Sequence, residues 1–219
     1  MLQRILEPEV MDTPEDAQEY DAMDFTEVNA AFAREAIAAC PHGGTILDAG
    51  TGTARIPLLI AQERADWAIV AIDLSAEMLR VGQQHIEQAG LSDRIRLEQV
   101  DAKQMPYADR AFDAVISNSI VHHLPDPMPF FREVKRVLKP NGSLFLRDLR
   151  RPEAMETVEQ LVGAIGAEYN AYQTKLFRDS LLASFTVAEV QQMLEDAELT
   201  GVRVYESSDR HWTAVRSPA

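Results

Sequence analysis

From Thr45 onward, the chain alternates short apolar segments of β-prone residues with segments whose apolar residues recur at helical spacing. This alternation is typical of an α/β protein with helices wound on both faces of a parallel sheet. The apolar segments predict five strands, at 45–48, 67–73, 95–100, 112–117 and 143–148. The intervening segments predict helices over 54–64, over 75–90 between the cap Ser75 and Gly90, and over 127–138. Pro140-Asn141-Gly142 predicts a turn before the fifth strand.

Both flanks of this region are mainly helical. Thr13-Pro14-Glu15-Asp16 is typical of a helix start, and the alanine-rich segment Glu27–Ala39 predicts a second helix. Beyond Arg151, Pro152 suits the first turn of a helix that runs toward Tyr169. Thr186-Val187-Ala188-Glu189 has the spacing of a capping box and predicts the start of another helix.

Two segments near the C-terminus, 200–205 and 212–215, predict strands that complete the sheet as an antiparallel pair. We therefore divide the chain into an N-terminal helical cover, residues 1–44, and a core, residues 45–219, with a helical insertion at about 152–185. The helices of the cover and the insertion have no place in the sheet. We expect them to lie over its carboxyl edge, where open α/β sheets bind ligands.

The composition indicates a folded and strongly acidic protein. Of the 219 residues, 46% are hydrophobic, which excludes a largely disordered chain, and the formal net charge is −14. Such a charge disfavours nonspecific binding to nucleic acid or to an anionic membrane. Cys40 is the single cysteine, which excludes an intrachain disulfide and a cysteine metal cluster. Because neither a leader pattern nor an apolar run of membrane-spanning length is found, we expect a cytoplasmic protein without membrane insertion.

The strongest local motif is a glycine turn between the first strand and the first helix, Asp48-Ala49-Gly50-Thr51-Gly52-Thr53-Ala54. Gly50 and Gly52 can adopt positive φ and let a ligand approach the backbone. The amides of the turn and of the helix N-terminus form a polar, weakly positive cradle. The turn therefore predicts a site for a nucleotide-type ligand, with a purely structural turn as the alternative. Ala54 stands where the dinucleotide motif has its third glycine.

Acidic residues end the next two strands. Asp73 ends the second strand beside the glycine turn, where a carboxylate can accept both hydroxyls of a ribose; a helix-capping or surface role is the alternative. Asp101, followed by Ala102, ends the third strand. A carboxylate there can accept an adenine amino group while the next backbone N–H donates to a ring nitrogen, although a polar strand end is also a common structural feature.

Two adjacent histidines, His122 and His123, follow the fourth strand. Two adjacent side chains cannot both face one way on a regular element, so at most one is expected in the site while the other packs or caps. A metal site with Asp126 as third ligand is the competing interpretation. No other histidine or acid has the spacing to complete such a site, so no metal is expected.

Together these motifs resemble the class I S-adenosylmethionine-dependent methyltransferases. The resemblance is closest to the small-molecule subgroup that includes the ubiquinone and menaquinone biosynthesis methyltransferases. It covers roughly Thr45 to Asp148 and is carried, in chain order, by Asp48-Ala49-Gly50-Thr51-Gly52, Asp73, Asp101-Ala102, Phe112-Asp113-Ala114-Val115, His122-His123-Leu124-Pro125-Asp126 and Leu138-Lys139-Pro140-Asn141-Gly142. The resemblance implies a Rossmann-like, seven-stranded sheet with the last strand antiparallel, which agrees with the predicted tail. It also implies an enzyme that transfers a methyl group from S-adenosylmethionine to a small molecule.

The resemblance further implies which residues bind the cofactor: Asp48, Gly50, Gly52, Asp73, Leu74, Asp101, Ala102 and Asn118. The three residues of the glycine turn would line the methionine part, and Asp73 would hold the ribose hydroxyls. Leu74 would pack on the adenine face, while Asp101 and Ala102 would contact the adenine edge. Asn118 would lie near the methionine ammonium or the methyl donor.

Methyl transfer from a sulfonium is a direct displacement with a neutral leaving group, so the protein mainly supplies alignment and a dry pocket. A hydroxyl or protonated amine acceptor also needs a base. His123 and His122 are the candidate catalytic residues because imidazole titrates near neutral pH, and a structural histidine is the alternative. The acid Asp48 favours a ligand that carries an ammonium group and would repel the pyrophosphate of a dinucleotide.

The sequence does not identify the methyl acceptor or the oligomeric state. Residues of the cover and the insertion could line an acceptor pocket or be ordinary helix residues: Tyr20, Phe25, Tyr169, Tyr172, Phe177 and Arg178. A catalytically inactive S-adenosylmethionine-binding regulatory protein and a nicotinamide-dependent oxidoreductase are the alternative functions. Nucleic acid is not an expected partner, since Asn118-Ser119-Ile120-Val121 is not the Asn/Asp-Pro-Pro-aromatic sequence of amino-directed DNA methyltransferases.

Overall fold

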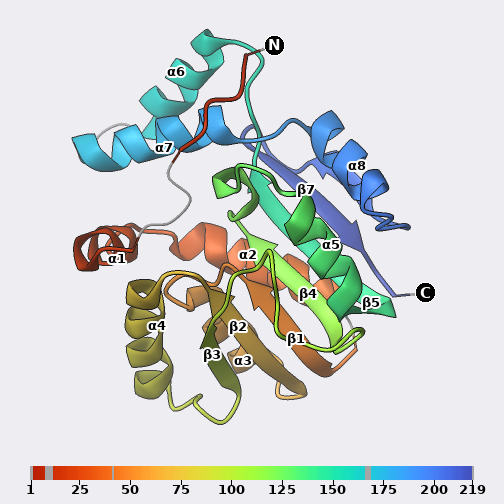
Figure 1. The fold of residues 1–219 in the computed structure, drawn as a ribbon. Coiled ribbons are helices and arrows are strands. Elements are labelled where there is room, and N and C mark those ends of the chain that lie inside the picture. Colours follow the sequence, from red (N-terminus) through yellow and green to blue (C-terminus); the bar gives the residue numbers. More distant parts are fainter. Residues whose placement is uncertain (1, 8–11, 41, 166–168, 219) are drawn as a thin grey trace.

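The computed structural model describes residues 2–7, 12–40, 42–165 and 169–218. Its centre is a seven-stranded sheet in the order β3-β2-β1-β4-β5-β7-β6 (Figure 1). The strands are β1 (Gly44–Ala49), β2 (Trp67–Asp73), β3 (Ile95–Gln99), β4 (Phe112–Asn118), β5 (Leu138–Leu149), β6 (Arg203–Glu206) and β7 (His211–Arg216). The first five strands are parallel, and β7 is antiparallel to both of its neighbours. The predicted doubly wound sheet with an antiparallel last strand is confirmed.

The described helices are α1 (Pro14–Asp21), α2 (Thr26–Ala39), α3 (Arg55–Glu63), α4 (Ala76–Ala89), α5 (Met128–Val137), α6 (Met155–Ile165), α7 (Ala171–Ala183) and α8 (Val187–Asp196), with a short 3-10 helix, η1 (Val121–His123). One core packs α2, α3 and α4 on one face of the sheet, around Phe32, Ile60 and Phe145. A second core packs α5 and α8 on the other face, around Phe130 and Phe131. Helices α6 and α7 lie beyond the strand ends (Figure 1). The carboxyl edge of the sheet is therefore bounded by helices on several sides.

The predicted ends of α4 and the predicted start of α8 are confirmed by their capping hydrogen bonds. The Ser75 hydroxyl accepts from the Met78 amide at the start of α4, and Gly90 ends that helix at a φ of 67°. At α8, Thr186 accepts from the Glu189 amide while the Glu189 carboxylate accepts from the Thr186 amide. Local side-chain chemistry therefore determines these helix ends.

The predicted turn at Pro140-Asn141-Gly142 is wrong, because these residues lie within β5. The pairing of β5 with β4 shifts there, from Leu138 opposite Phe112 to Ser143 opposite Ala114, so the extra residues form a bulge. The Arg216 guanidinium of β7 donates to the Gly142 carbonyl at 3.0 Å. A side chain from a distant strand thus holds the bulge in the sheet.

The helix predicted to start at Pro152 begins instead at Met155. Arg150 forms a bridge with Phe185, and the Arg151 amide donates to the Phe185 carbonyl, so the chain stays extended past the end of β5. The predicted end of this helix near Tyr169 crosses residues 166–168, which lie outside the described residues.

Helix α2 differs from the expected cover, since most of it packs on a face of the sheet. Phe32, Ala33 and Ala36 are buried against α3 and β5, and the Phe32 ring meets the Phe145 ring edge-on at 5.0 Å. Its burial follows from apolar residues at helical spacing. Within α2, only the N-terminal end lines the pocket described below.

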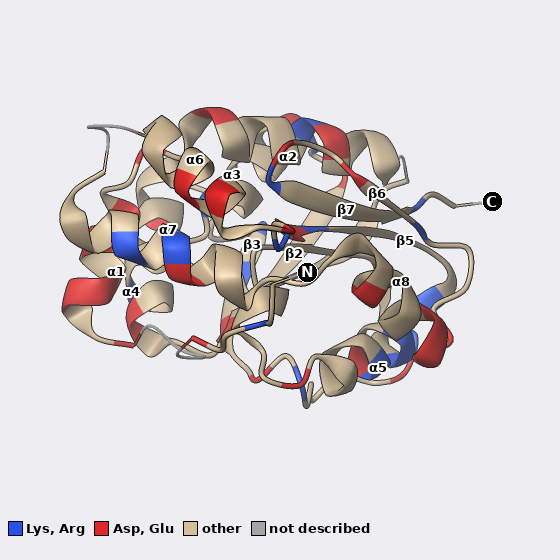
Figure 2. Cartoon of the chain, turned by 90° about the horizontal axis from the view of Figure 1, so that it is seen from above, with Lys and Arg blue, Asp and Glu red and all other residues tan. Residues whose placement is uncertain are grey.

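No helix in the described part of the chain is long and apolar enough to cross a membrane. Acidic positions occur on most helices, while α5 and α7 also carry lysine and arginine (Figure 2). The net charge of −14 is thus spread over the surface rather than confined to one element.

The capping box of α8 yields a stability prediction. Replacing Thr186→Ala should lower the free energy of unfolding by about 1 kcal/mol, because the Glu189 amide loses its acceptor. Urea denaturation followed by circular dichroism measures the change. Thr200→Ala, an exposed threonine in a turn, is the matched control and should stay within about 0.5 kcal/mol of the parent. Equal stability of Thr186→Ala and the parent would contradict the capping role.

Candidate active site

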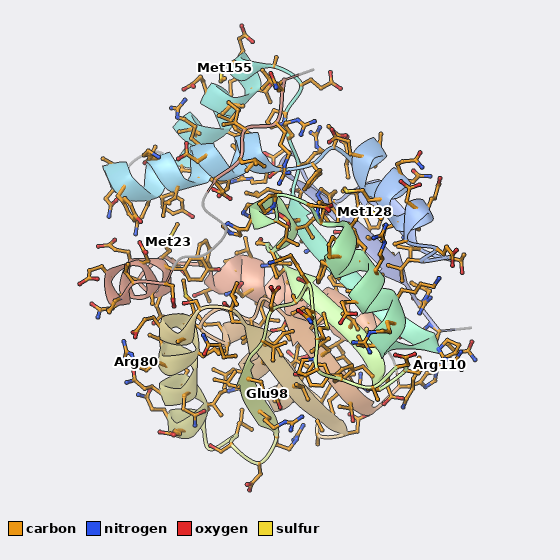
Figure 3. The ribbon with its side chains drawn as sticks, in the orientation of Figure 1. Met23, Arg80, Glu98, Arg110, Met128 and Met155 are labelled. Carbon is orange, nitrogen blue, oxygen red and sulfur yellow. The ribbon has the colours of Figure 1, made fainter. Side chains whose placement is uncertain are left out.

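A pocket lies where strands β1 and β4 end, between the glycine turn and the α1–α2 connection. Its lining residues are Tyr20, Phe25, Asn29, Asp48, Gly50, Thr51, Thr53, Arg55, Ile56 and Asn118. Figure 3 shows Met23, in the α1–α2 connection, and Met128, at the start of α5, on opposite sides of these strand ends. Three of the predicted cofactor residues thus share one pocket: Asp48 and Gly50 of the glycine turn, and Asn118, which is far from them in the sequence.

The glycine turn has the backbone shape that the sequence predicts. Gly50, Gly52 and Ala54 all have left-handed φ angles, of 75°, 55° and 60°. The amides of Gly50 and Thr51 both donate to the Ile72 carbonyl at 2.9 Å, which ties the turn to the end of β2. A Cβ on Gly50 would come within 2.8 Å of the Ile120 side chain, so this position has no room for another residue. At Gly52, by contrast, the nearest neighbour of such an atom is Tyr20 at 3.7 Å, which leaves the backbone approachable.

Asp48 is the second-last residue of β1 and lines the pocket. Its residue is 2% exposed, and burial raises the pKa of its carboxyl to about 7, with a smaller contribution from the charge of Asp73. A buried carboxyl in a pocket is costly to ionise unless a cation compensates it. The position therefore suits a positively charged ligand group.

Asp73 joins the turn to the next helix. Its Oδ2 accepts from the Gly52 amide at 2.8 Å, and its Oδ1 accepts from the Ser75 amide at 2.9 Å. Burial raises the pKa of the Asp73 carboxyl, and the hydrogen bonds from these amides oppose the shift. Leu74, the next residue, is 38% exposed. Each carboxylate oxygen can accept a further hydrogen bond, so Asp73 can bind a ligand while it holds the turn.

Asp101 and Ala102 lie after β3, next to Asp73. The Val100 amide donates to the Asp73 carbonyl at 3.0 Å, which brings the two strand ends together. The Asp101 carboxylate accepts from the Lys103 amide at 2.8 Å, and Ala102 is buried. These residues do not line the pocket of Asp48, so the structure brings them to the same edge of the sheet without placing them in that pocket.

The cover contributes two aromatic residues to the pocket. The rings of Tyr20 and Phe25 lie 5.2 Å apart, between α1 and α2. Burial raises the pKa of Tyr20 to about 12, with the Asp73 charge as the next cause. The sequence assigned both residues to a possible acceptor pocket, whereas they line the same pocket as Asp48. Thr53 of the glycine turn also lines it, and so does Asn29, which no sequence pattern had indicated.

The two histidines lie on η1 and face carboxylates from two other parts of the chain, Glu7 and Asp148. His122 is 4% exposed, and its Nδ1 contacts Asp148 of β5. Its Nε2 lies 3.4 Å from Glu7 Oε1, while Nδ1 of His123 lies 3.1 Å from the same oxygen. Burial opposes protonation of His122, yet Asp148 and Glu7 together raise its pKa. Burial raises the pKa of Glu7. Burial also acts to raise the pKa of Asp148, but the neighbouring His122 outweighs it and the pKa of Asp148 is lowered.

Sequence reasoning missed Glu7 and Asp148. Asp148 ends an apolar strand, the same signal that identified Asp73, and could have been found from it. Glu7 has no local signal, because the N-terminal segment reaches η1 only through tertiary contacts. Asp126, the metal ligand that the sequence considered, lies just before α5 and accepts from the Met128 amide at 3.0 Å.

The other candidate acceptor residues that can be placed have structural partners. Arg178 pairs with Glu159 of α6, and the Tyr172 hydroxyl donates to Asp16 of α1 at 2.7 Å. Phe177 packs against the core of α6 and α7. These contacts join the insertion helices to each other and to the cover.

Comparison with known proteins relates this chain to methyltransferases. The model of a family described as a methyltransferase domain matches residues 42–198. The ubiquinone biosynthesis O-methyltransferase of Xanthomonas axonopodis is 33% identical over 131 residues, which span 60% of this chain and 52% of that protein. The ubiquinone/menaquinone biosynthesis C-methyltransferase of Geotalea daltonii is 28% identical over 162 residues, 69% of this chain and 68% of the relative. The matched part of this chain thus spans between half and two thirds of these relatives.

A solved structure shares the fold over nearly the whole chain. It is described as an S-adenosyl-L-methionine-dependent methyltransferase of Methanococcus maripaludis and superposes with a TM-score of 0.73 at 19% identity, covering 98% of each chain. Because the family model matches more than half of the chain and the solved structure shares its fold, the chain belongs to the methyltransferase-domain family.

Proposed function

We propose that this protein transfers the methyl group of S-adenosylmethionine to a small-molecule acceptor by direct displacement. The observation that carries the proposal is the buried carboxyl of Asp48 beside the approachable backbone of Gly52. The cofactor is an amino acid joined to a nucleoside, and its ammonium supplies the cation that a buried carboxylate needs. A pyrophosphate in the same position would be repelled.

The residues of the strand ends fit the parts of the cofactor in order. Asp48 would pair with the ammonium, and the turn backbone would line the methionine chain. Each oxygen of Asp73 can still accept a hydrogen bond from a ribose hydroxyl. These bonds would be strong because the acceptor is charged. Beyond it, Leu74 offers an apolar face for the adenine, and Asp101 with the Ala102 amide lies where the adenine edge would reach.

Displacement at a sulfonium methyl needs little chemical assistance. The cofactor supplies an activated methyl group with a neutral leaving group, and the enzyme aligns the acceptor with it. Tyr20, Phe25 and Ile56 supply apolar surface around the pocket and would exclude water from the reacting atoms. Asn118 would orient the methionine end with its amide.

The acceptor end of the site is assigned to the histidine pair. We propose that His123, the more exposed of the two at 25%, contacts the acceptor. His122 would either position His123 or contact the acceptor next to it. The named relatives methylate oxygen in one case and carbon in the other, so the comparison favours a small molecule but not one acceptor atom. An inactive cofactor-binding protein is the alternative outcome, and it would bind the cofactor without turnover.

Ligand-dependent thermal stability tests the cofactor. S-adenosylmethionine or S-adenosylhomocysteine at about one hundred times its dissociation constant should stabilise the protein by about 2.7 kcal/mol. For a chain of this length, the melting temperature should rise by about 5–10 °C. NAD and NADP at the same concentration should produce no comparable shift. A shift with either nicotinamide and none with the sulfur ligands would reject the proposal.

Asp73→Asn tests the ribose contact in the same assay. The amide keeps the shape of the side chain but loses the charge and one acceptor, so the dissociation constant for S-adenosylhomocysteine should rise about tenfold or more. Isothermal titration calorimetry measures it, and circular dichroism verifies the fold because Asp73 also holds Gly52 and Ser75. Asp93→Asn, an exposed acid at the opposite end of the neighbouring strands, is the matched control. Equal affinities of Asp73→Asn and the parent would remove the ribose role.

The pKa of Asp48 predicts how cofactor affinity depends on pH. Because the carboxyl titrates at about 7 in the free protein and the ionised form attracts the ammonium, affinity should rise with pH. Between pH 5.5 and 7, where the ligand α-amino group stays charged, the dissociation constant should fall by about tenfold. Calorimetry at four pH values measures the slope, and Asp48→Asn should bind more weakly with a flat profile. A flat profile in the parent protein would contradict the pairing.

The histidine pair is tested by separating turnover from cofactor binding. His123→Ala should reduce transfer of labelled methyl into a cell extract by at least about tenfold, the low end of the contribution of a group that acts on the acceptor. Its affinity for S-adenosylhomocysteine should stay unchanged. His42→Ala, an exposed histidine outside the site, is the control. Unchanged transfer in both His122→Ala and His123→Ala, with intact folds, would remove the pair from the reaction.

A further inference from the structure

We propose that Glu7, His122 and His123 form a binding site for a divalent transition-metal ion of the zinc class. Each residue offers one ligand atom, and these atoms all lie within 4.8 Å of one another. Two imidazoles and one carboxylate are a donor set that zinc uses in catalytic sites, where a fourth position stays open. From the sequence, the two histidines were considered as metal ligands only together with Asp126 and no metal was expected, because the third ligand proposed here, Glu7, comes from the N-terminal segment.

The distances in the cluster are close to those that such an ion requires. A tetrahedral zinc ion with bonds of about 2.0–2.1 Å separates its ligand atoms by about 3.3 Å. In the structure, Glu7 Oε1 lies 3.4 Å from His122 Nε2 and 3.1 Å from His123 Nδ1. The carboxylate oxygen therefore already stands at ligand spacing from both nitrogens.

The surroundings of His122 are those of a metal ligand. Its Nδ1 contacts the buried carboxylate of Asp148 and its Nε2 faces Glu7, so a ring that gives up one proton to a metal ion would keep the other at Asp148 and bind through Nε2. Metal-bound histidines typically donate their second ring nitrogen to a carboxylate in this way, which orients the ring and raises its basicity. Asp148 also accepts from the Val121 amide at 2.6 Å, which fixes η1 to β5.

The N-terminal segment is held so that Glu7 stays over the histidines. The Arg4 guanidinium donates to the carbonyls of His122 at 3.0 Å and of Leu124 at 2.7 Å, and it lies over the Phe185 ring. The Ile5 amide donates to the Leu182 carbonyl at the end of α7 at 3.1 Å, and this segment runs beside α7 in Figure 1. These contacts position the third ligand before any ion binds.

The exposure of the three ligands points to an open coordination position. The side chains of Glu7 and His122 are 6% and 4% exposed, while that of His123 is 25% exposed. The open position would therefore lie on the His123 side and would hold water. If the proposed methyl transfer is correct, this position would hold an oxygen or sulfur donor of the acceptor, and this part of the inference rests on the proposed function.

Zinc binding by the full chain tests the site. The tag-free protein, stripped with EDTA, should bind one zinc ion per chain with micromolar or tighter affinity in calorimetry, and cobalt should produce a d–d absorption band. Glu7→Gln and His123→Asn, which keep the side-chain size, should each weaken zinc binding at least about tenfold. Asp126→Asn, an acid on the same loop, and His42→Asn, an exposed histidine, should bind zinc as the parent does.

The outcomes separate the metal site from the proposed function. No zinc binding by the folded parent, or equal binding by Glu7→Gln, would overturn the metal site and leave an ion-paired histidine cluster. Loss of labelled-methyl transfer on chelation, with recovery on adding zinc, would support the acceptor position, while unchanged transfer would overturn it. Failure to bind S-adenosylhomocysteine in the thermal assay would instead reject the proposed function, whatever the zinc stoichiometry.

Discussion

The carboxylate of Asp73 is the point on which the geometry of the site depends. Its two oxygens accept from the amides of Gly52 and Ser75, so one side chain holds both the glycine turn and the start of α4. The amides of Gly50 and Thr51 donate to the Ile72 carbonyl, and these bonds also tie the turn after β1 to the end of β2. A turn whose φ angles are left-handed at three positions needs such support, since left-handed backbone is unfavourable at Ala54. The binding surface is therefore formed before a ligand arrives.

The second organising element is the N-terminal part of the chain, which contributes to both ends of the site. Residues of the α1–α2 connection line the pocket of Asp48, and the segment before residue 8 brings a carboxylate to the histidines of η1. Its attachments are hydrogen bonds to loop carbonyls and to the end of α7. The N-terminal part of the chain thus contacts both the pocket of Asp48 and the histidine pair.

Much of the core followed from the pattern of residues. The period of the apolar segments predicted the five parallel strands, and caps such as Ser75 and Thr186 predicted the helix ends, because a side chain and an amide three residues away suffice to form them. The errors have a different origin. Pro140-Asn141-Gly142 has turn chemistry, yet Arg216 of β7 holds it as a bulge in β5. The start of α6 is displaced by pairing of Arg150 and Arg151 with Phe185.

The sequence by itself determined the fold class and the order of strand-end motifs, since both depend on local chemistry and on the common edge of parallel strands. The glycine turn and the acids Asp73 and Asp101 were recognised from their places at predicted strand ends, whereas the proposed roles of Leu74 and Asn118 came from the family resemblance. The tertiary structure decided which side chains meet around the histidine pair. Asp148 lies only 26 residues after His122, but Glu7 lies more than a hundred residues before it, and its approach depends on packing of the N-terminal segment against α7 and η1. No local pattern encodes such a contact, because its free energy comes from burial and pairing across the fold.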